Sequence, residues 1–302
     1  MTPLPPEDSK RNGVKTLFVA AGDISWGSSR MRAWWPAKYM DGAKVVLPSQ
    51  AGPDKFPLEY DAYIFQKLAN PQINRTLLEH GKQVWWDVCD PAWWFQPDQC
   101  REIASTVTGA VASSCNLALD FNSWFGKGIC EHIPDRLELG HFPFKRNHQE
   151  HKTIRLVWFG VSVNRFVLFG ALANLERLAA NGYAIELTIF DNQPKIKMFE
   201  CGFPVKYKCW RLEQENEILS NQDIAVLPPY PGPWGAVKSN NKQLTAWACG
   251  LPVWDGLDYE TGRVLISDPV FRKVSAAEGF RWVEDNYQVE QSAREWEALL
   301  GC

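Results

Sequence analysis

The chain has 302 residues, of which 45% are hydrophobic and 22% charged, and this length suits two α/β domains of ordinary size. Its formal net charge of -3 excludes a protein held on nucleic acid by a global basic field, but allows an enzyme that meets DNA through one local patch. No apolar run reaches the ~18 residues of a membrane span, and we expect no signal peptide in the Pro-rich, charged start of the chain.

The eight cysteines form no C-x-x-C pair, and no His-x-x-x-His partner follows them. We therefore expect free thiols in a reducing cytoplasm and no metal site. Residues 141–152 carry three of the five histidines in a polar stretch without periodicity. A solvated linker is the favoured interpretation of this stretch, and a clustered-histidine metal site is the alternative.

Strands and helices alternate through the first half of the chain. We predict strands at residues 14–21, 44–47, 61–66, 83–88, 109–113 and 130–134, and helices at 30–40, 71–80 and 118–124. The pattern restarts after the linker, with strands at 153–160, 184–190, 203–210 and 223–227, helices at 164–180 and 241–248, and a charged helical tail over 278–300. Alternation at this spacing indicates βαβ units and parallel sheets.

The most informative stretch is residues 227–254, LPPYPGPWGAVKSNNKQLTAWACGLPVW. A strand leads into a loop stiffened by prolines, and the loop opens a helix whose first turn offers free N–H groups and a positive dipole end. Lys238 and Lys242 add charge to this anion site, and Ser239, Asn240 and Asn241 can cap the helix or donate to phosphate oxygens. An ordinary capped helix after a proline-rich turn is the alternative.

A second strand–loop–helix junction lies at the end of the strand 153–160. Gly160 permits close approach of a ligand to the backbone, and Arg165 can pair with a diphosphate or simply cap a helix face. Ser162 and Asn164 of the same loop complete the predicted contact set. Ligands of doubly wound sheets bind at the carboxyl ends of strands, where both loops are expected.

These segments resemble the GT-B glycosyltransferases. LTAWACGLPVW resembles their small-residue helix and following turn, VWFG with the later NR resembles the opening of their nucleotide-binding domain, and GSSRMRAWWPAKYM resembles their N-terminal Gly-rich loop and helix. HIPDRLEL resembles the segment that leads into their interdomain crossing, and K-S-N-N-K resembles phage and bacterial enzymes, some linked to DNA hypermodification.

The resemblance implies two Rossmann-like domains whose parallel sheets face each other across a cleft. The expected division is an acceptor domain over 1–147, a donor domain over 148–280, and a C-terminal helix over 281–302 that packs back toward the first domain. It also implies a cytoplasmic, metal-independent enzyme, in a bacterium or a phage-infected host, with no permanently bound cofactor and a nucleotide-diphosphate sugar, such as a UDP-sugar, as co-substrate.

One family feature is missing. The common retaining families place a Glu before a second Glu that holds the donor ribose, with seven residues between the two, and these positions fall here on Val237 and Thr245. Thr245 remains a predicted donor contact, and Asp191 and Glu213 are the candidates to supply the missing carboxylate.

The acceptor is expected over the first domain. Predicted contacts come from the loop and helix after the first strand and from WWDVCDPAWWF: Ser28, Ser29, Arg30, Arg32, Trp34, Asp87, Trp93 and Trp94. Eight of the fifteen tryptophans precede residue 130, and we expect two or three of these rings to stack on a ligand, with Trp35 a further candidate.

An inverting transfer needs a base near the acceptor hydroxyl, and a retaining transfer does not. Asp90 is the first candidate base and Asp23 the second, although Asp90 can also serve as a turn former before Pro91. The predicted function is sugar transfer from a nucleotide sugar to an acceptor hydroxyl, first of all a 5-hydroxymethylated pyrimidine in phage DNA. The alternatives are a polysaccharide or lipid-linked acceptor, a nucleotide-sugar epimerase, or a non-catalytic sugar-nucleotide binding module.

Overall fold

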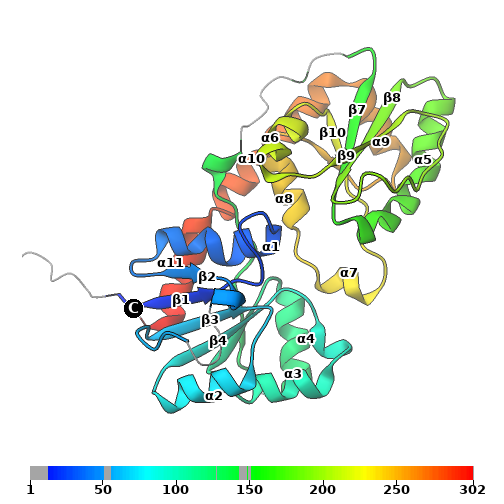
Figure 1. Ribbon diagram of the computed structural model, residues 1–302. Coiled ribbons are helices and arrows are strands. Elements are labelled where there is room, and N and C mark those ends of the chain that lie inside the picture. Colours follow the sequence, from blue (N-terminus) through cyan, green and yellow to red (C-terminus); the bar gives the residue numbers. More distant parts are fainter. Residues whose placement is uncertain (1–12, 51–55, 127, 143–147, 149–150, 302) are drawn as a thin grey trace, which may run out of the picture.

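The computed structural model describes residues 13–50, 56–126, 128–142, 148 and 151–301, and the chain folds into two lobes, each built on a parallel sheet flanked by helices (Figure 1). The predicted linker is thus covered only in part, because residues 143–147 and 149–150 lie outside the described residues. Among the described residues, no helix is long and apolar enough to cross a membrane, and no group of three or more His, Cys, Asp or Glu side chains could hold a metal ion.

The first lobe contains a six-stranded sheet of order β2-β1-β3-β4-β5-β6, with every pairing parallel. Its strands are β1 (Thr16–Val19), β2 (Lys44–Val46), β3 (Ala62–Gln66), β4 (Gln83–Val88), β5 (Gly109–Ala112) and β6 (Cys130–His132). Its helical segments are α1 (Gly27–Ser29), η1 (Arg30–Trp34), η2 (Pro36–Tyr39), η3 (Pro48–Gln50), α2 (Pro71–Glu79), η5 (Ala92–Trp94), α3 (Pro97–Ala104), α4 (Cys115–Phe125) and η6 (Leu139–His141).

The second lobe contains a five-stranded parallel sheet of order β11-β10-β7-β8-β9. Its strands are β7 (Ile154–Gly160), β8 (Ile185–Asp191), β9 (Val205–Cys209), β10 (Ile224–Val226) and β11 (Val253–Trp254). Its helical segments are η7 (Ser162–Leu168), α5 (Phe169–Ala180), α6 (Leu212–Ser220), α7 (Pro233–Val237), α8 (Asn241–Ala248), α9 (Tyr259–Ser267) and the first part of α10 (Pro269–Asn286).

Buried runs and caps account for most of these elements. The central strands β1, β3, β5 and β10 are buried along their whole length, as strands covered by helices on both faces must be. Asn70 accepts hydrogen bonds from two amides at the start of α2, and Ser114 accepts one at the start of α4. Gly126, with a φ of 61°, ends α4 in the left-handed conformation.

Two predicted helices are irregular. The helix expected over 30–40 is a succession of α1, the π-helix η1 and the 3-10 helix η2, whose first residue, Pro36, has no backbone N–H to continue the helical ladder. The helix expected over 164–180 begins as the 3-10 helix η7 and becomes α-helical only at Phe169. Helices α3, α6, α7 and α9 were not predicted from the sequence.

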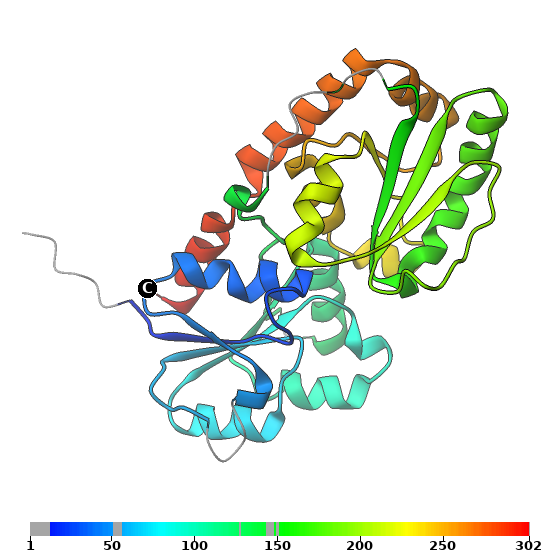
Figure 2. The same cartoon turned by 45° about the horizontal axis from the view of Figure 1, so that its top comes forward.

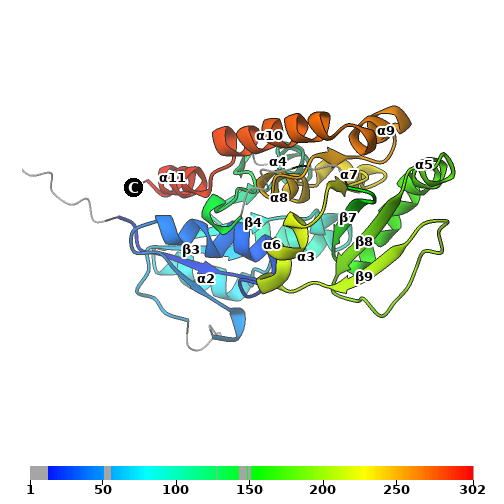
Figure 3. The same ribbon diagram turned by 90° about the horizontal axis from the view of Figure 1, so that it is seen from above.

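The end of the chain returns to the first lobe. Helix α10 runs along one side of the molecule, and α11 (Val289–Leu300) packs on the first lobe (Figures 2 and 3). There Trp296 meets the rings of Phe18 and Trp85 edge-on. Where α10 gives way to α11, this segment pairs with the chain leaving β6: Leu137 donates to the Tyr287 carbonyl at 2.9 Å and accepts from the Val289 amide at 3.0 Å. The two passages between the lobes are thus hydrogen-bonded to each other.

A candidate donor and acceptor site between the two lobes

The loop that begins with the Pro-rich segment after β10 touches the first lobe. Helix α7 reaches α4 (Figure 1). There Ser114 Oγ donates to the Val237 carbonyl at 2.7 Å and Asn116 Nδ2 donates to the Ala236 carbonyl at 2.8 Å. These contacts bring the start of α8 opposite the carboxyl ends of β3, β4 and β6. The two sheet edges that the sequence predicts to carry ligands therefore face each other.

Asp90 lies just beyond β4 and is paired with two lysines. Its Oδ2 is 2.9 Å from Lys67 Nζ, and its Oδ1 accepts a hydrogen bond from Lys238 of the opposite lobe. Burial raises the pKa of the Asp90 carboxyl, but the charges of Lys67 and Lys238 outweigh burial and hold this pKa below its ordinary value. Asp90 is therefore ionised at neutral pH and accessible, with 29% of its side chain exposed.

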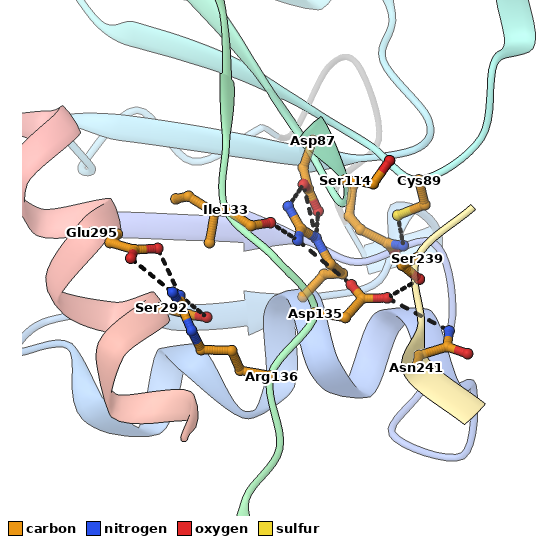
Figure 4. Close-up of polar contacts among 12 residues, drawn as sticks. Asp87, Cys89, Ser114, Ile133, Asp135, Arg136, Ser239, Asn241, Ser292 and Glu295 are labelled. Atoms are coloured by element: carbon orange, nitrogen blue, oxygen red, sulfur yellow. Dashed lines mark hydrogen bonds and ion pairs between the residues drawn. The ribbon is translucent and has the colours of Figure 1, made fainter. Parts of the chain in front are cut away.

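A second carboxylate, Asp135, contacts the same loop. Its Oδ2 accepts from Ser239 Oγ at 2.6 Å and from Asn241 Nδ2 at 3.5 Å (Figure 4). The side chains predicted to donate to phosphate oxygens thus point, in this structure, toward carboxylates of the first lobe. Lys238, Ser239 and Asn241 therefore face negative oxygen atoms of the protein, while Asn240 is exposed, and the binding of a phosphate by this loop stays a prediction.

Lys242, the second residue of α8, is different. Its Nζ stands 5.1 Å from the centroid of the Trp158 ring, close to Gly160, and it has no ion pair or hydrogen bond within the described part of the chain. Burial, and then the charge of Lys238, lowers the pKa of Lys242 to about 8. An ammonium group held in this way at the end of β7 is a ready contact for an anion.

Arg165 and Asp191 require a correction. The Arg165 guanidinium is 1% exposed, lies 2.6 Å from Asp191 Oδ1 through Nη2, and also donates to Asp191 Oδ2 and to the carbonyls of Gln193 and Ile196. The N–H groups of this guanidinium are already hydrogen-bonded to protein oxygens. It is therefore not available to a diphosphate, and Asp191 is not available to a ribose. The pair instead joins η7 to the end of β8.

Three predicted acceptor contacts are also corrected. Arg32 is buried and binds both oxygens of the buried Asp87, at 3.0 and 3.1 Å from its Nε, and it also donates to the Ile133 carbonyl. Arg30 is buried against Glu215 of the second lobe, at 2.9 Å. These groups link elements of the protein to one another and do not face an acceptor.

The Gly-rich loop after β1 is held by its own side chains. Ser29 Oγ is buried, accepts from the Gly22 amide at 3.0 Å and donates to Gln66 at 2.9 Å, and Trp34 Nε1 donates to the Gly22 carbonyl at 3.1 Å. Ser28 is half-buried in α1. Asp23 is exposed and turns back onto Ser25, whose hydroxyl and amide lower the pKa of its carboxyl, so Asp23 is the weaker candidate base.

Some of the tryptophans predicted to stack on a ligand lie in the core, and others lie where the two lobes meet. Trp93 is fully buried against Phe121, and Trp35 is buried in a cluster shared by both lobes, so neither ring can stack on a ligand. Trp94 instead meets Trp234 of the opposite lobe, with ring centroids 6.0 Å apart. Phe95, which is 69% exposed, approaches the same Trp234 ring at 5.5 Å.

The remaining predicted donor contacts lie on both loops of the second lobe. The amide of Ser162 donates to Asn192 Oδ1 at 2.9 Å, and Asn164 Oδ1 accepts from Tyr230 at 3.1 Å. Asn240 is exposed at the N-cap of α8, and Thr245 is buried within that helix. Glu213 is exposed in the first turn of α6.

Sequence reasoning missed Lys67, Phe95 and Trp234 as parts of this site. Phe95 directly follows Trp93 and Trp94, which were predicted to contact the acceptor, so its position in the sequence could have identified it. Lys67 and Trp234 carry no local signature, because their importance comes from Asp90 and from the rings of the opposite lobe.

No protein-family model matches the sequence, and no curated protein is significantly similar to it in sequence. Solved structures are similar in fold. An alpha-glucosyltransferase in complex with UDP and a 13-mer DNA has a TM-score of 0.65 and 11% identity, over 95% of this chain and 99% of that one. A T4 phage BGT mutant in complex with UDP-glucose has a TM-score of 0.55 and 11% identity, over 94% and 97%.

TarM is also similar, with a TM-score of 0.59 and 13% identity over 80% of this chain, which spans 55% of the length of TarM. These likenesses concern the fold, since the identities are low. This chain has two parallel sheets in separate lobes, a crossing after β6 and a terminal helix that returns to the first lobe. The chain has the GT-B fold of the nucleotide-sugar glycosyltransferases.

Proposed function

We propose that this protein transfers a sugar from a nucleotide diphosphate, with UDP-sugars the first class to test, to an acceptor hydroxyl. The observation that carries the proposal is the Lys242 ammonium, which is half-buried at the end of β7 and has no anionic partner among the described residues. A partly desolvated charge without a counter-ion is unfavourable, and a bound diphosphate supplies that counter-ion.

Donor binding follows from the two loops of the second lobe. Lys242 and Lys238 neutralise the diphosphate, while Ser239, Asn240 and Asn241 bring hydroxyl, amide and backbone donors to the start of α8. Gly160, Ser162 and Asn164 line the neighbouring loop and approach the nucleotide. Because two ammonium groups carry the neutralisation, we propose transfer without a metal, and turnover is expected to be the same in EDTA.

Asp90 is the proposed base. The acceptor oxygen attacks the anomeric carbon, the bond from that carbon to the phosphate oxygen breaks, and the electron pair leaves with the diphosphate. Asp90 takes the proton of the acceptor hydroxyl, and the lysines stabilise the charge that develops on the leaving group. A base in this role implies inversion at the anomeric carbon.

For the acceptor we propose a 5-hydroxymethylated pyrimidine in DNA. Support comes from the exposed Phe95 ring beside Trp234, close to the Asp90–Lys238 pair, because base–aromatic stacking holds an unstacked base. It also comes from the fold shared with an alpha-glucosyltransferase that binds UDP and DNA. Polysaccharide and lipid-linked hydroxyls are the competing acceptors.

The test is incubation with a panel of nucleotide sugars and three acceptors, namely hydroxymethylated DNA, the same DNA unmodified, and an oligosaccharide. Released nucleotide and modified acceptor are both measured. We expect UDP release that depends on hydroxymethylated DNA. Isomerised donor without an acceptor would instead identify an epimerase, and UDP binding without turnover against any acceptor would identify a binding module.

A further inference from the structure

The backbone of Lys67 is unusual. Its φ of 63° makes it the one non-glycine residue with a positive φ in the described part of the chain. An L-residue meets steric strain in this region, which Gly and Asn tolerate better than Lys. The conformation is imposed from both sides, since the Lys67 amide donates to the Asp87 carbonyl at 2.8 Å and its carbonyl accepts from Trp86 Nε1 at 3.1 Å. Strain of this kind is concentrated at functional sites.

The side chain of Lys67 contacts the proposed base, Asp90. Lys67 Nζ lies 2.9 Å from Asp90 Oδ2, and both residues follow neighbouring strands of one sheet, where Gln66 is paired with Asp87. The Lys67–Asp90 distance is therefore set within the first lobe. Lys238, which holds the other oxygen, belongs to the second lobe.

We propose that Lys67 is a positioning residue, which holds one oxygen of Asp90 while Lys238 leaves the other oxygen for the donor diphosphate. This inference rests on the proposed function, in which Asp90 is the base. Once Lys238 has left, Oδ1 is free to accept the acceptor proton, and Lys67 is the cation that keeps Asp90 oriented and ionised.

The charged and titratable groups around Asp90 determine in which direction its pKa moves when the charge of Lys67 is lost. Lys67 faces it from the end of β3 and Lys238 from the opposite lobe, while Cys89 is its chain neighbour and Asp135 lies beside the same lysines. The two lysines lower the pKa of Asp90, and Cys89, whose own pKa burial raises to about 12, stays neutral. Loss of the Lys67 charge therefore moves the protonation of Asp90 to higher pH.

The test compares Lys67→Asn with Lys67→Arg. Asn suits a positive φ and removes the ammonium, so the fold is retained, and Arg restores the charge. We expect Lys67→Asn to shift the acid limb of the kcat/KM profile upward by about one pH unit. We also expect kcat to fall with UDP affinity within twofold of wild type, and Lys67→Arg to recover most of kcat.

The matched control is Lys82→Asn, which removes another lysine of the first lobe, paired with Asp61 at the opposite edge of the sheet. It is expected to leave the pH profile unchanged. An unmoved acid limb in Lys67→Asn would overturn the proposal. A loss of UDP affinity equal to the loss of kcat would also overturn it, since Lys67 would then be a donor ligand.

A second measurement separates this inference from the proposed function. The carboxyl carbon of Asp90 is titrated by NMR without substrate, in wild type and in Lys67→Asn, with Asp90→Asn to assign the signal. Transfer by wild type with an unmoved titration and an unmoved profile would refute the role of Lys67 alone. Absence of transfer by wild type would refute the function and the positioning role together, even with the titration moved.

Discussion

Lys242 occupies the space that a side chain would take at Gly160. A Cβ built on Gly160 would stand 2.9 Å from both Cε and Nζ of Lys242, closer than real contacts allow. The φ of Gly160 is 153°, and the Trp158 ring lies beside the same ammonium. Because Gly160 has no side chain, the ammonium group of Lys242 can reach the end of β7.

Gly160→Ala is therefore expected to displace the Lys242 ammonium and to lower UDP affinity at least about tenfold, equivalent to about 1.4 kcal/mol. Titration calorimetry with UDP measures this effect. The matched control is Gly182→Ala in the same lobe, where φ is 88° and no atom lies within 4 Å of the added Cβ. It imposes backbone strain alone, so equal losses of affinity in both variants would contradict the steric explanation.

Lys242→Met tests the ammonium directly. With a pKa of about 8, Lys242 loses its charge as the pH rises through 8, so wild-type UDP affinity should fall between pH 7 and 9. The variant should bind UDP weakly at both pH values. The exposed Lys273→Met is the control and should retain the wild-type pH dependence.

The same lysine affects stability with a defined sign. Its pKa is about 8 in the folded chain and ~10.4 in an unfolded one, so between these values the unfolded chain binds more protons. The free energy of unfolding of the wild type should therefore rise with pH across this window. Urea denaturation should show a smaller rise for Lys242→Met, and identical slopes would mean that the pKa of Lys242 is not lowered in the folded chain.

Asp90→Asn removes the base and the counter-ion of Lys238 together. Loss of a general base lowers kcat by roughly 10²- to 10⁴-fold. UDP affinity should stay the same or increase, because Lys238 no longer has a carboxylate to exchange for the diphosphate. Turnover and calorimetry measure the two effects, and a product with retained anomeric configuration would exclude Asp90 as the base.

Phe95→Ala tests the aromatic contribution to acceptor binding. We expect the KM for hydroxymethylated DNA to rise by about tenfold, since base–aromatic stacking contributes ~1–3 kcal/mol per base, while UDP affinity is unchanged. Trp282→Ala on α10 is the control, because its ring is also large and exposed, at 53%. If both variants bind DNA equally well, the acceptor does not stack on Phe95.

Arg165→Met tests the corrected role of the Arg165–Asp191 pair. Breaking a buried ion pair leaves a charge without a partner and costs about 3–5 kcal/mol of unfolding free energy. Arg263→Met, which breaks the exposed pair with Glu260, should cost less than about 1 kcal/mol. Urea denaturation compares them, and a fully stable Arg165→Met that has lost only UDP binding would restore the original prediction.

Much of the fold could be predicted from the sequence because burial patterns are local. Strands such as β4, predicted with its observed bounds, appear as short apolar runs, and α8 starts at the predicted residue although the N-cap Asn240 makes no side-chain capping hydrogen bond. The GT-B arrangement followed from a few motif segments. Helix α7 escaped prediction because a five-residue helix has too little periodicity to detect.

The site was harder to predict because its side chains are paired across long stretches of sequence. Arg165 lies where a residue that binds phosphate is expected, yet its guanidinium forms an ion pair with Asp191 at the end of the neighbouring strand. Both residues were predicted donor contacts, but their ion pair could not be predicted from the sequence. Conversely, Asp90 and Lys238 were assigned to acceptor and donor separately, and their contact across the lobes appears only in three dimensions.

The pairing of Leu137 with Tyr287 and Val289 has a mechanical consequence. Both passages of the chain between the lobes are hydrogen-bonded to each other at this point, so a rotation of one lobe about it would displace atoms in proportion to their distance from it. The hydrogen bonds that join α7 to Ser114 and Asn116 of the first lobe would have to break in such a rotation.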